Sequence, residues 1–159
     1  EISLGLVGSE MCIRDRFRHT MPVQIRFSDV DQFGHMNNSV YFSLYDLAKT
    51  TYIKDVLGSA DWSKLAIVVA NINANFFMPV FFSDHLVIET AVVHLGHKSF
   101  TLLQRAVTTD THEVKCECRT VMVGYDLATK EPKLISEDYK EAICRYEEKT
   151  LEELSKERK

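Results

Sequence analysis

The hydrophobic and polar positions change their period along the chain. In residues 21–27, apolar and polar side chains alternate, which predicts a strand with one solvated face. Apolar residues then recur near helical spacing from Val40 through Leu44 and Leu47 to Leu57, and Gly58 is a natural end for a helix. A strand followed by one long helix is therefore expected.

The rest of the chain predicts antiparallel strands. Alternation recurs in residues 66–77, 84–96, 98–108 and 113–126, with turn residues between them. In the first of these segments, Asn71, Asn73 and Asn75 form a polar ladder opposite apolar residues. A last helix is expected after Ser136, a residue that commonly caps helix starts, and it frays into charged residues.

This order of elements predicts an α+β fold in a single domain, residues 17–150. One long central helix is packed against a curled antiparallel sheet of about five strands, and a C-terminal helix follows. Residues 151–159 are expected to be a charged tail. Residues 1–16 have no sustained period and resemble translated adapter sequence, so we interpret them as a non-native or disordered leader.

The net charge and the cysteines limit which binding partners, metal sites and cellular location are expected. The net charge of −4 gives no general attraction to nucleic acid or anionic lipid, and the apolar runs are shorter than the roughly 20 residues of a spanning helix. Neither nucleic acid nor a membrane is expected as a partner. The four cysteines lack metal-ligand spacing, and Cys116 and Cys118 are poorly placed for a disulfide, so we expect no metal site and a cytoplasmic location.

The stretch RFSDVDQFGHMNN, residues 26–38, gathers acidic and amide side chains and a histidine where the strand pattern becomes helical. The motif continues to Lys49 as DVDQFGHMNNSVYFSLYDLAK, residues 29–49, with a tyrosine, Tyr41, three residues after Asn38. Together with the order of elements and with GHKSFTLLQR at residues 96–105, this motif resembles the hotdog-fold acyl-CoA thioesterases of the 4-hydroxybenzoyl-CoA thioesterase-like family. The likeness covers roughly residues 20–145. It implies hydrolysis of an acyl-CoA thioester to a carboxylic acid and CoA, with no cofactor, since CoA is part of the substrate.

The resemblance implies three catalytic residues in this stretch. Asp31 would activate water as a general base or attack the carbonyl as a nucleophile, although an aspartate before glycine also commonly bonds its own turn. His35 would orient water or bond to Asp31, or else cap the helix or tie the loop to the sheet. The main-chain N–H near Asn38 would donate to the oxyanion, because helix starts carry unpaired N–H groups at the positive end of the dipole. The side-chain amides of Asn37 and Asn38 would instead cap the helix, and both roles can hold together.

Other residues have secondary roles. Asp29 is expected in a structural salt bridge or a turn bond, and Asp46 is a second candidate acid on the helix. Phe33 stands where the related plant-type acyl-carrier-protein thioesterases have an asparagine, so an Asp-Asn-His arrangement is not intact.

For the coenzyme, the resemblance implies phosphate contacts near Lys98. His97 would assist these contacts, and Ser99 would bond the pantetheine arm. The edge strands of a sheet expose unpaired N–H and C=O groups, and hotdog domains usually pair edge to edge, so we expect a homodimer or a dimer of dimers. Each site would combine the Asp31 loop of one subunit with strand residues of the other.

Two rival functions stay open at this point. A hotdog enoyl-CoA hydratase or dehydratase would also place Asp and His near a helix start, and a non-catalytic acyl-binding or interaction module would keep the fold without the chemistry. Apolar residues at the end of the first long strand segment and just after it favour room for a fatty or aromatic acyl group, although phenylalanines in a strand more often belong to the core. They are Phe76, Phe77, Met78, Phe81 and Phe82.

Overall fold

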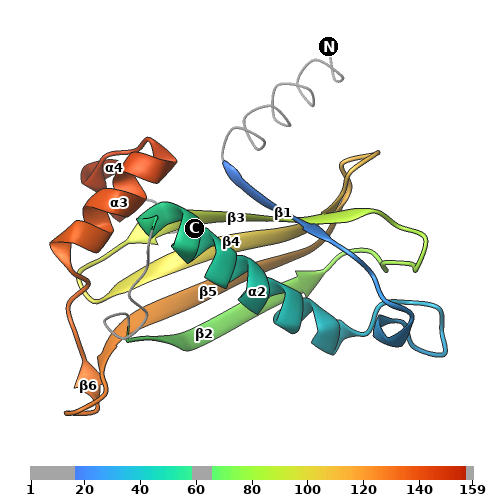
Figure 1. Ribbon diagram of the computed structural model, residues 1–159, viewed down its shortest axis with the longest axis horizontal. Helices are drawn as coiled ribbons and strands as arrows, with labels where there is room; N and C mark the ends of the chain where they lie inside the picture. The colour runs from blue at the N-terminus through green and yellow to red at the C-terminus, as the bar shows by residue number, and fades with distance from the viewer. Residues whose placement is uncertain (1–16, 59–65, 157–159) are drawn as a thin grey trace.

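The computed structural model describes residues 17–58 and 66–156 (Figure 1). A long helix, α2 (Asn38–Leu57), lies across one face of an antiparallel sheet. Two further helices, α3 (Glu137–Glu147) and α4 (Leu151–Lys156), pack near the end of α2 that is closer to Leu57. The predicted leader, residues 1–16, lies outside the described residues.

The sheet has the strand order β1-β3-β4-β5-β2, and every neighbouring pair is antiparallel. Its long strands are β2 (Ile67–Phe76), β3 (Leu86–Leu95), β4 (Ser99–Thr108) and β5 (Val114–Asp126). The short β1 (His19–Val23) forms one edge, and β6 (Glu131–Pro132) pairs only with the end of β5. The α+β class and the antiparallel sheet of about five main strands are thus confirmed, and β1 and β2 are its two edges.

Residues next to its two ends determine where helix α2 begins and ends. The Asn37 side chain accepts a hydrogen bond from the Ser39 main-chain N–H at 3.0 Å, which caps the start. Gly58, with φ of 76°, ends the helix in a backbone conformation that residues with a Cβ rarely adopt. Among the described residues, no helix is long and apolar enough to cross a membrane.

The buried face of α2 is formed mainly by tyrosines. Tyr41, Tyr45 and Tyr52 are almost completely buried, whereas Leu47, which the sequence pattern placed among the apolar positions, is more than half exposed. The Tyr45 hydroxyl donates to the Cys116 carbonyl at 3.2 Å, and the Gln104 side-chain amide donates to the Tyr45 carbonyl at 3.0 Å. These bonds satisfy polar groups between helix and sheet, so the core tolerates phenolic side chains.

The first strand is shorter than the alternation predicts. Strand β1 ends at Val23, and Phe27–Asp29 forms a 3₁₀ turn that leaves Phe27 on the surface. The turn is held by Asp29, whose carboxylate accepts hydrogen bonds from the main chain and the guanidinium of Arg26. A side chain that bonds the backbone three residues earlier competes with the strand ladder and bends the chain toward α2.

The segment from residue 151, expected to be a charged tail, contains the helix α4 in its described part. Leu154 is fully buried there, in one apolar cluster with Ile143 of α3 and Leu95 of β3. A single buried leucine with charged neighbours holds this helix against the domain.

Candidate functional site

The loop between β1 and α2 is anchored by Asp29. This carboxylate is buried, and it accepts from the Arg26 N–H at 2.8 Å and from the Arg26 guanidinium at 3.0 Å. Burial acts to raise the pKa of Asp29, but the hydrogen bonds and charge of Arg26 hold the pKa below its ordinary value. The Asn37 N–H also donates to the Asp29 carbonyl at 2.9 Å. Asp29 therefore forms the structural salt bridge expected of it and fixes the start of α2.

Asp31 lies on the exposed surface of the same loop. One of its carboxylate oxygens accepts from the Phe33 N–H at 2.9 Å, which closes a turn that Gly34, with φ of 82°, completes. The main-chain N–H of Asp31 donates to the His35 carbonyl at 2.9 Å. Asp31 thus makes the turn bond that is common for aspartate before glycine, and its carboxylate stays accessible to solvent or to a substrate.

His35 ties this loop to the connector between β2 and β3. It forms an isolated antiparallel bridge with Phe81, and its ring meets the Phe81 ring edge to face at 5.3 Å between centroids. The next residue, Met36, donates its N–H to the Val80 carbonyl at 2.7 Å. His35 therefore has the loop-tying role that we considered, and its half-buried ring remains at the edge of a cleft.

This cleft has a volume of about 280 Å³ and lies between the start of α2 and the β2–β3 connector. Asn38, the first residue of α2, lines it, and the N–H groups at a helix start have no acceptor within the helix. The helix dipole adds partial positive charge at the same point. The other lining residues are mostly apolar: His35, Met36, Tyr41, Phe76, Phe77, Met78 and Pro79.

Tyr41 forms the inner wall of the cleft. Its ring meets the Phe76 ring at 5.3 Å and lies 6.3 Å from the Tyr45 ring farther along the helix. Burial raises the pKa of Tyr41 well above its ordinary value, so its hydroxyl is neutral at physiological pH. Tyr41 follows Asn38 by three residues in the motif that carried the resemblance, and this spacing is the sequence signal for its place here.

Asp46 lies farther along α2 and is largely exposed. Its carboxylate pairs with the Lys49 ammonium at 2.9 Å, and Lys49 is itself buried. The described cleft does not include Asp46, so within one chain this acid is not placed beside Asn38.

The three residues expected to contact CoA are at the other end of the sheet. His97 and Lys98 lie in the turn between β3 and β4, and Ser99 is the first residue of β4; the Gly96 N–H donates to the Ser99 carbonyl at 2.8 Å. Strand β3 begins at Leu86, which pairs with Val23 just before the Asp31 loop, and runs away from that loop toward this turn (Figure 1). A single chain therefore does not bring the two predicted groups of site residues together.

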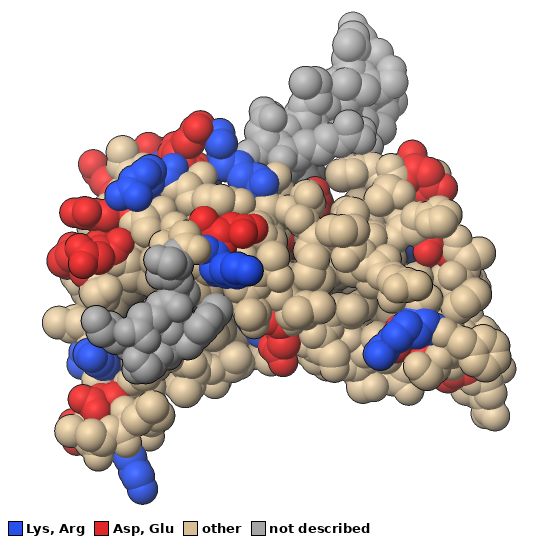
Figure 2. Space-filling model, in the orientation of Figure 1, with Lys and Arg blue, Asp and Glu red and all other residues tan. Residues whose placement is uncertain are grey.

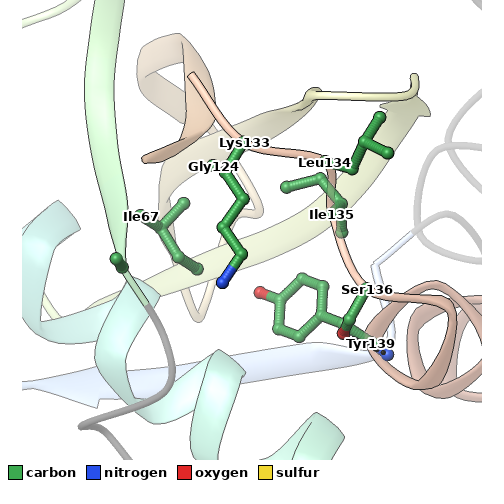
Figure 3. Close-up of a pocket in the computed structure, with 8 residues that line it drawn as sticks. Ile67, Gly124, Lys133, Leu134, Ile135, Ser136 and Tyr139 are labelled. Atoms are coloured by element: carbon green, nitrogen blue, oxygen red, sulfur yellow. Dashed lines mark hydrogen bonds between the residues drawn. The ribbon is translucent and has the colours of Figure 1, made fainter. Parts of the chain in front are cut away.

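Further hollows lie near this second end of the sheet, among them a groove and a smaller cavity. A groove of about 610 Å³ runs between the β3–β4 turn and the helices α3 and α4, and His97 lines it with Lys140 and Glu152. A smaller cavity of about 70 Å³ lies where β2 begins, with the Lys133 and Tyr139 side chains beside it (Figure 3). Neither contains a residue of the Asp31 loop.

The charged side chains are unevenly distributed over the surface. On the face shown in Figure 2, Lys, Arg, Asp and Glu side chains gather over α3 and α4, whereas the half near the Asp31 loop is mostly uncharged. Among the described residues, no group of three or more His, Cys, Asp and Glu side chains is arranged to hold a metal ion. The region of the cleft thus offers the positive end of the α2 dipole at Asn38, one exposed carboxylate, a histidine and apolar walls.

Residues 25–143 match the family model of the thioesterase-like superfamily. The chain is also similar to the long-chain acyl-CoA thioesterase FadM of Escherichia coli strain K12. The identity is 26% over 124 residues, which cover 76% of this chain and 93% of that protein.

Solved structures agree with this match. A thioesterase from Thermus thermophilus, complexed with coenzyme A and Zn, superposes with a TM-score of 0.76 and 26% identity, over 86% of this chain and 98% of that one. A 4-hydroxybenzoyl CoA thioesterase complexed with 4-hydroxybenzoyl CoA shares the fold, with a TM-score of 0.70, 21% identity, and coverage of 79% and 97%. The predicted hotdog fold is confirmed by these comparisons.

Proposed function

Because the chain belongs to the thioesterase-like superfamily of thioester hydrolases, we propose that it cleaves an acyl-CoA to a free carboxylic acid and CoA. The observation that carries this proposal is the cleft, in which the first residue of α2 faces apolar walls next to the Asp31 loop. The similarity to FadM and to a thioesterase complexed with coenzyme A supports the same substrate class.

In this proposal, the thioester carbonyl oxygen accepts a hydrogen bond from the Asn38 N–H, which stabilises the negative charge that develops on that oxygen. The Asp31 carboxylate takes a proton from water, and the water oxygen attacks the carbonyl carbon. The carbon–sulfur bond then breaks, and CoA leaves as a thiolate that is stable enough to need no dedicated acid. His35, on the edge of the cleft, orients the water or the carbonyl oxygen.

The same atoms support a second route. The Asp31 carboxylate attacks the carbonyl carbon itself and expels the CoA thiolate, which leaves an acyl-enzyme anhydride for water to hydrolyse. Both routes need the charge of Asp31, whereas its turn bond to the Phe33 N–H needs only an oxygen acceptor. This difference separates the chemical role of Asp31 from its structural role.

We propose further that two chains pair through β2. Strand β2 is an edge of the sheet and exposes apolar side chains, including Val68, Val69, Ile72 and Phe76. An unpaired edge with apolar side chains is an unfavourable surface for a monomer, and a second copy covers it without any change in fold.

Antiparallel pairing of two β2 strands would place the Ile67 end of one beside the Phe76 end of the other. Ile67 pairs with Gly124 of β5, whose N–H donates to the Lys98 carbonyl at 2.9 Å. Lys98 of the partner subunit would then lie about three strand spacings, on the order of 14 Å, from the cleft. An extended CoA molecule spans such a distance, so the dimer accounts for the separation of the two site groups within one chain.

The free thiols support a proposal for the cellular compartment. The described cysteines Cys116, Cys118 and Cys144 are free, and the first two are buried beneath α2. Free thiols persist in a reducing environment, so we propose the cytoplasm as the location.

The proposal is tested by measuring free CoA released from a panel of acyl-CoAs. The test compares wild type with Asp31→Asn and Asp31→Ala, and Asp126→Asn is a matched control. Asp126 also closes a turn, accepting from the Ala128 N–H at 2.8 Å, but at the far end of the sheet. We expect Asp31→Asn, which keeps an acceptor oxygen for the turn, to lose about a hundredfold or more in kcat, and Asp126→Asn to lose little.

Each other outcome has a definite meaning. Hydrolysis unchanged by both Asp31 substitutions contradicts the role of Asp31. Binding of acyl-CoA without turnover in the wild type favours the non-catalytic acyl-binding module, and hydration of enoyl-CoA without thioester cleavage favours the hydratase.

A further inference from the structure

Four phenylalanines form an exposed apolar surface beside the cleft, which we call the aromatic strip. They are Phe27, Phe77, Phe81 and Phe82, with exposed fractions of 86%, 57%, 44% and 53%. Large apolar side chains that gather on a surface usually mark a binding site. The hydrophobic core does not account for these four rings, because they lie outside its clusters.

The strip is continuous with the cleft. Phe77 lines the cleft, and Phe81 packs on His35, another lining residue, at 5.3 Å between ring centroids. Phe82 follows in the chain and meets Phe27 edge to face at 6.2 Å. The contacts run from the mouth of the cleft, along the β2–β3 connector, to the 3₁₀ turn before α2.

The cleft by itself is too small for a long acyl chain. Its volume of about 280 Å³ is below the roughly 300–1,000 Å³ of sites that bury drug-sized ligands. Its inner wall is closed, because Tyr41 and Tyr45 are almost fully buried and the Tyr45 hydroxyl is bonded to the Cys116 carbonyl. A chain longer than the cleft must therefore leave it along the surface instead of entering the core.

Two charged side chains next to the strip, Arg26 and Asp84, already have partners within the protein. The Arg26 guanidinium pairs with Asp29, and the Asp84 carboxylate accepts from the Phe81 N–H at 2.8 Å. The protein surface near the Asp31 loop carries few charges on the face shown in Figure 2. These features suit an uncharged, flexible hydrocarbon chain better than a charged ligand.

We propose that the aromatic strip binds the distal carbons of the acyl chain and so gives the enzyme a preference for long acyl chains. This inference rests on the proposed acyl-CoA hydrolysis. The reacting thioester lies at Asn38, the first carbons fill the cleft, and the remaining methylene groups lie over Phe81, Phe82 and Phe27. Each methylene removed from water adds to transition-state binding, which raises kcat/KM for long substrates over short ones.

The test measures kcat/KM for dodecanoyl-CoA, below its micelle concentration, and for butanoyl-CoA. The variants are Phe82→Ser, Phe27→Ser and the double variant, and Leu127→Ser serves as the control. Leu127 is 71% exposed in the turn between β5 and β6, far from the cleft. We expect the ratio of the two kcat/KM values to fall about fivefold for each single variant and more for the double variant, and to stay constant in Leu127→Ser.

The outcomes separate the two proposals. A wild type that cleaves neither substrate overturns the proposed hydrolysis. A wild type that cleaves them with a ratio unaffected by the double variant overturns the aromatic strip. If the double variant changes its oligomeric state while the ratio of the two kcat/KM values stays unchanged, the aromatic strip is also overturned as an acyl site. That result assigns the four rings to contacts between copies of the chain.

Discussion

Glu147, the last residue of α3, provides a test of how the C-terminal helix is held on the domain. Its side chain is only 7% exposed in total and faces Tyr52 of α2 and the main chain of Val92 in β3. Burial raises the pKa of Glu147 from 4.5 to about 7, and the nearby Val92 main chain and Tyr52 hydroxyl oppose this only in part. We predict that Glu147→Gln removes a pH-dependent loss of stability.

The sign follows from proton binding. Between pH 4.5 and about 7, the folded protein keeps a proton on Glu147 that the unfolded chain releases. The stabilisation is therefore complete below the unfolded pKa and is lost as the pH rises through the folded pKa. The gap between the two pKa values corresponds to about 3 kcal/mol, of which about 2.5 kcal/mol falls between pH 5 and 8.

The assay is urea unfolding of wild type and Glu147→Gln at about pH 5 and about pH 8, with Glu141→Gln as the control. Glu141 is exposed on the same helix, so its substitution leaves the pH dependence as in the wild type. From the lower to the higher pH, the free energy of unfolding should fall by about 2.5 kcal/mol more in the wild type than in Glu147→Gln. Parallel pH profiles for the two proteins would refute the reasoning.

Two other predictions concern the sheet. In Gly124→Ala, the new Cβ would meet the Lys133 carbonyl oxygen at 2.5 Å, so we expect the free energy of unfolding in urea to fall by about 1–3 kcal/mol. In the control Gly96→Ala, the nearest contact of the new Cβ is 3.3 Å, and an equal fall there would contradict this steric cause. Ile72→Lys should shift the chain from dimer to monomer in sedimentation measurements, because a charge on the open edge of β2 opposes strand pairing. The control Leu127→Lys also adds a lysine at an exposed apolar residue, but far from that edge, so it should leave the dimer intact. A dimer of unchanged affinity in Ile72→Lys would count against pairing through β2.

The sequence by itself determined the order of elements and the ends of the main helix. Strand and helix periods are properties of neighbouring residues, and the Asn37 cap and the Gly58 stop act within one turn of the chain. The turn bond of Asp31 and the salt bridge of Asp29 are equally local, since each partner lies within three residues. Such features can be predicted without knowledge of the fold.

The tertiary structure decided which residues meet across the sheet. Period alone placed Leu47 among the apolar positions of α2, but the buried face of the helix holds Tyr41 and Tyr45. The Tyr45 hydroxyl is accepted there because Cys116, on a distant strand, supplies the oxygen to which it donates. Likewise, the Lys98 turn carried part of the resemblance, yet the strand order places it at the opposite end of the sheet from Asp31.

The cleft itself depends on the β2–β3 connector, which lies against the helix start through the Met36–Val80 and His35–Phe81 contacts. These contacts join segments more than forty residues apart, as the numbers of Met36 and Val80 show. The energy of each contact depends on strand order and register, which no short window of sequence contains. Local chemistry therefore gave the reactive groups of this protein, and only the packing of distant segments gave the cleft and the aromatic surface beside it.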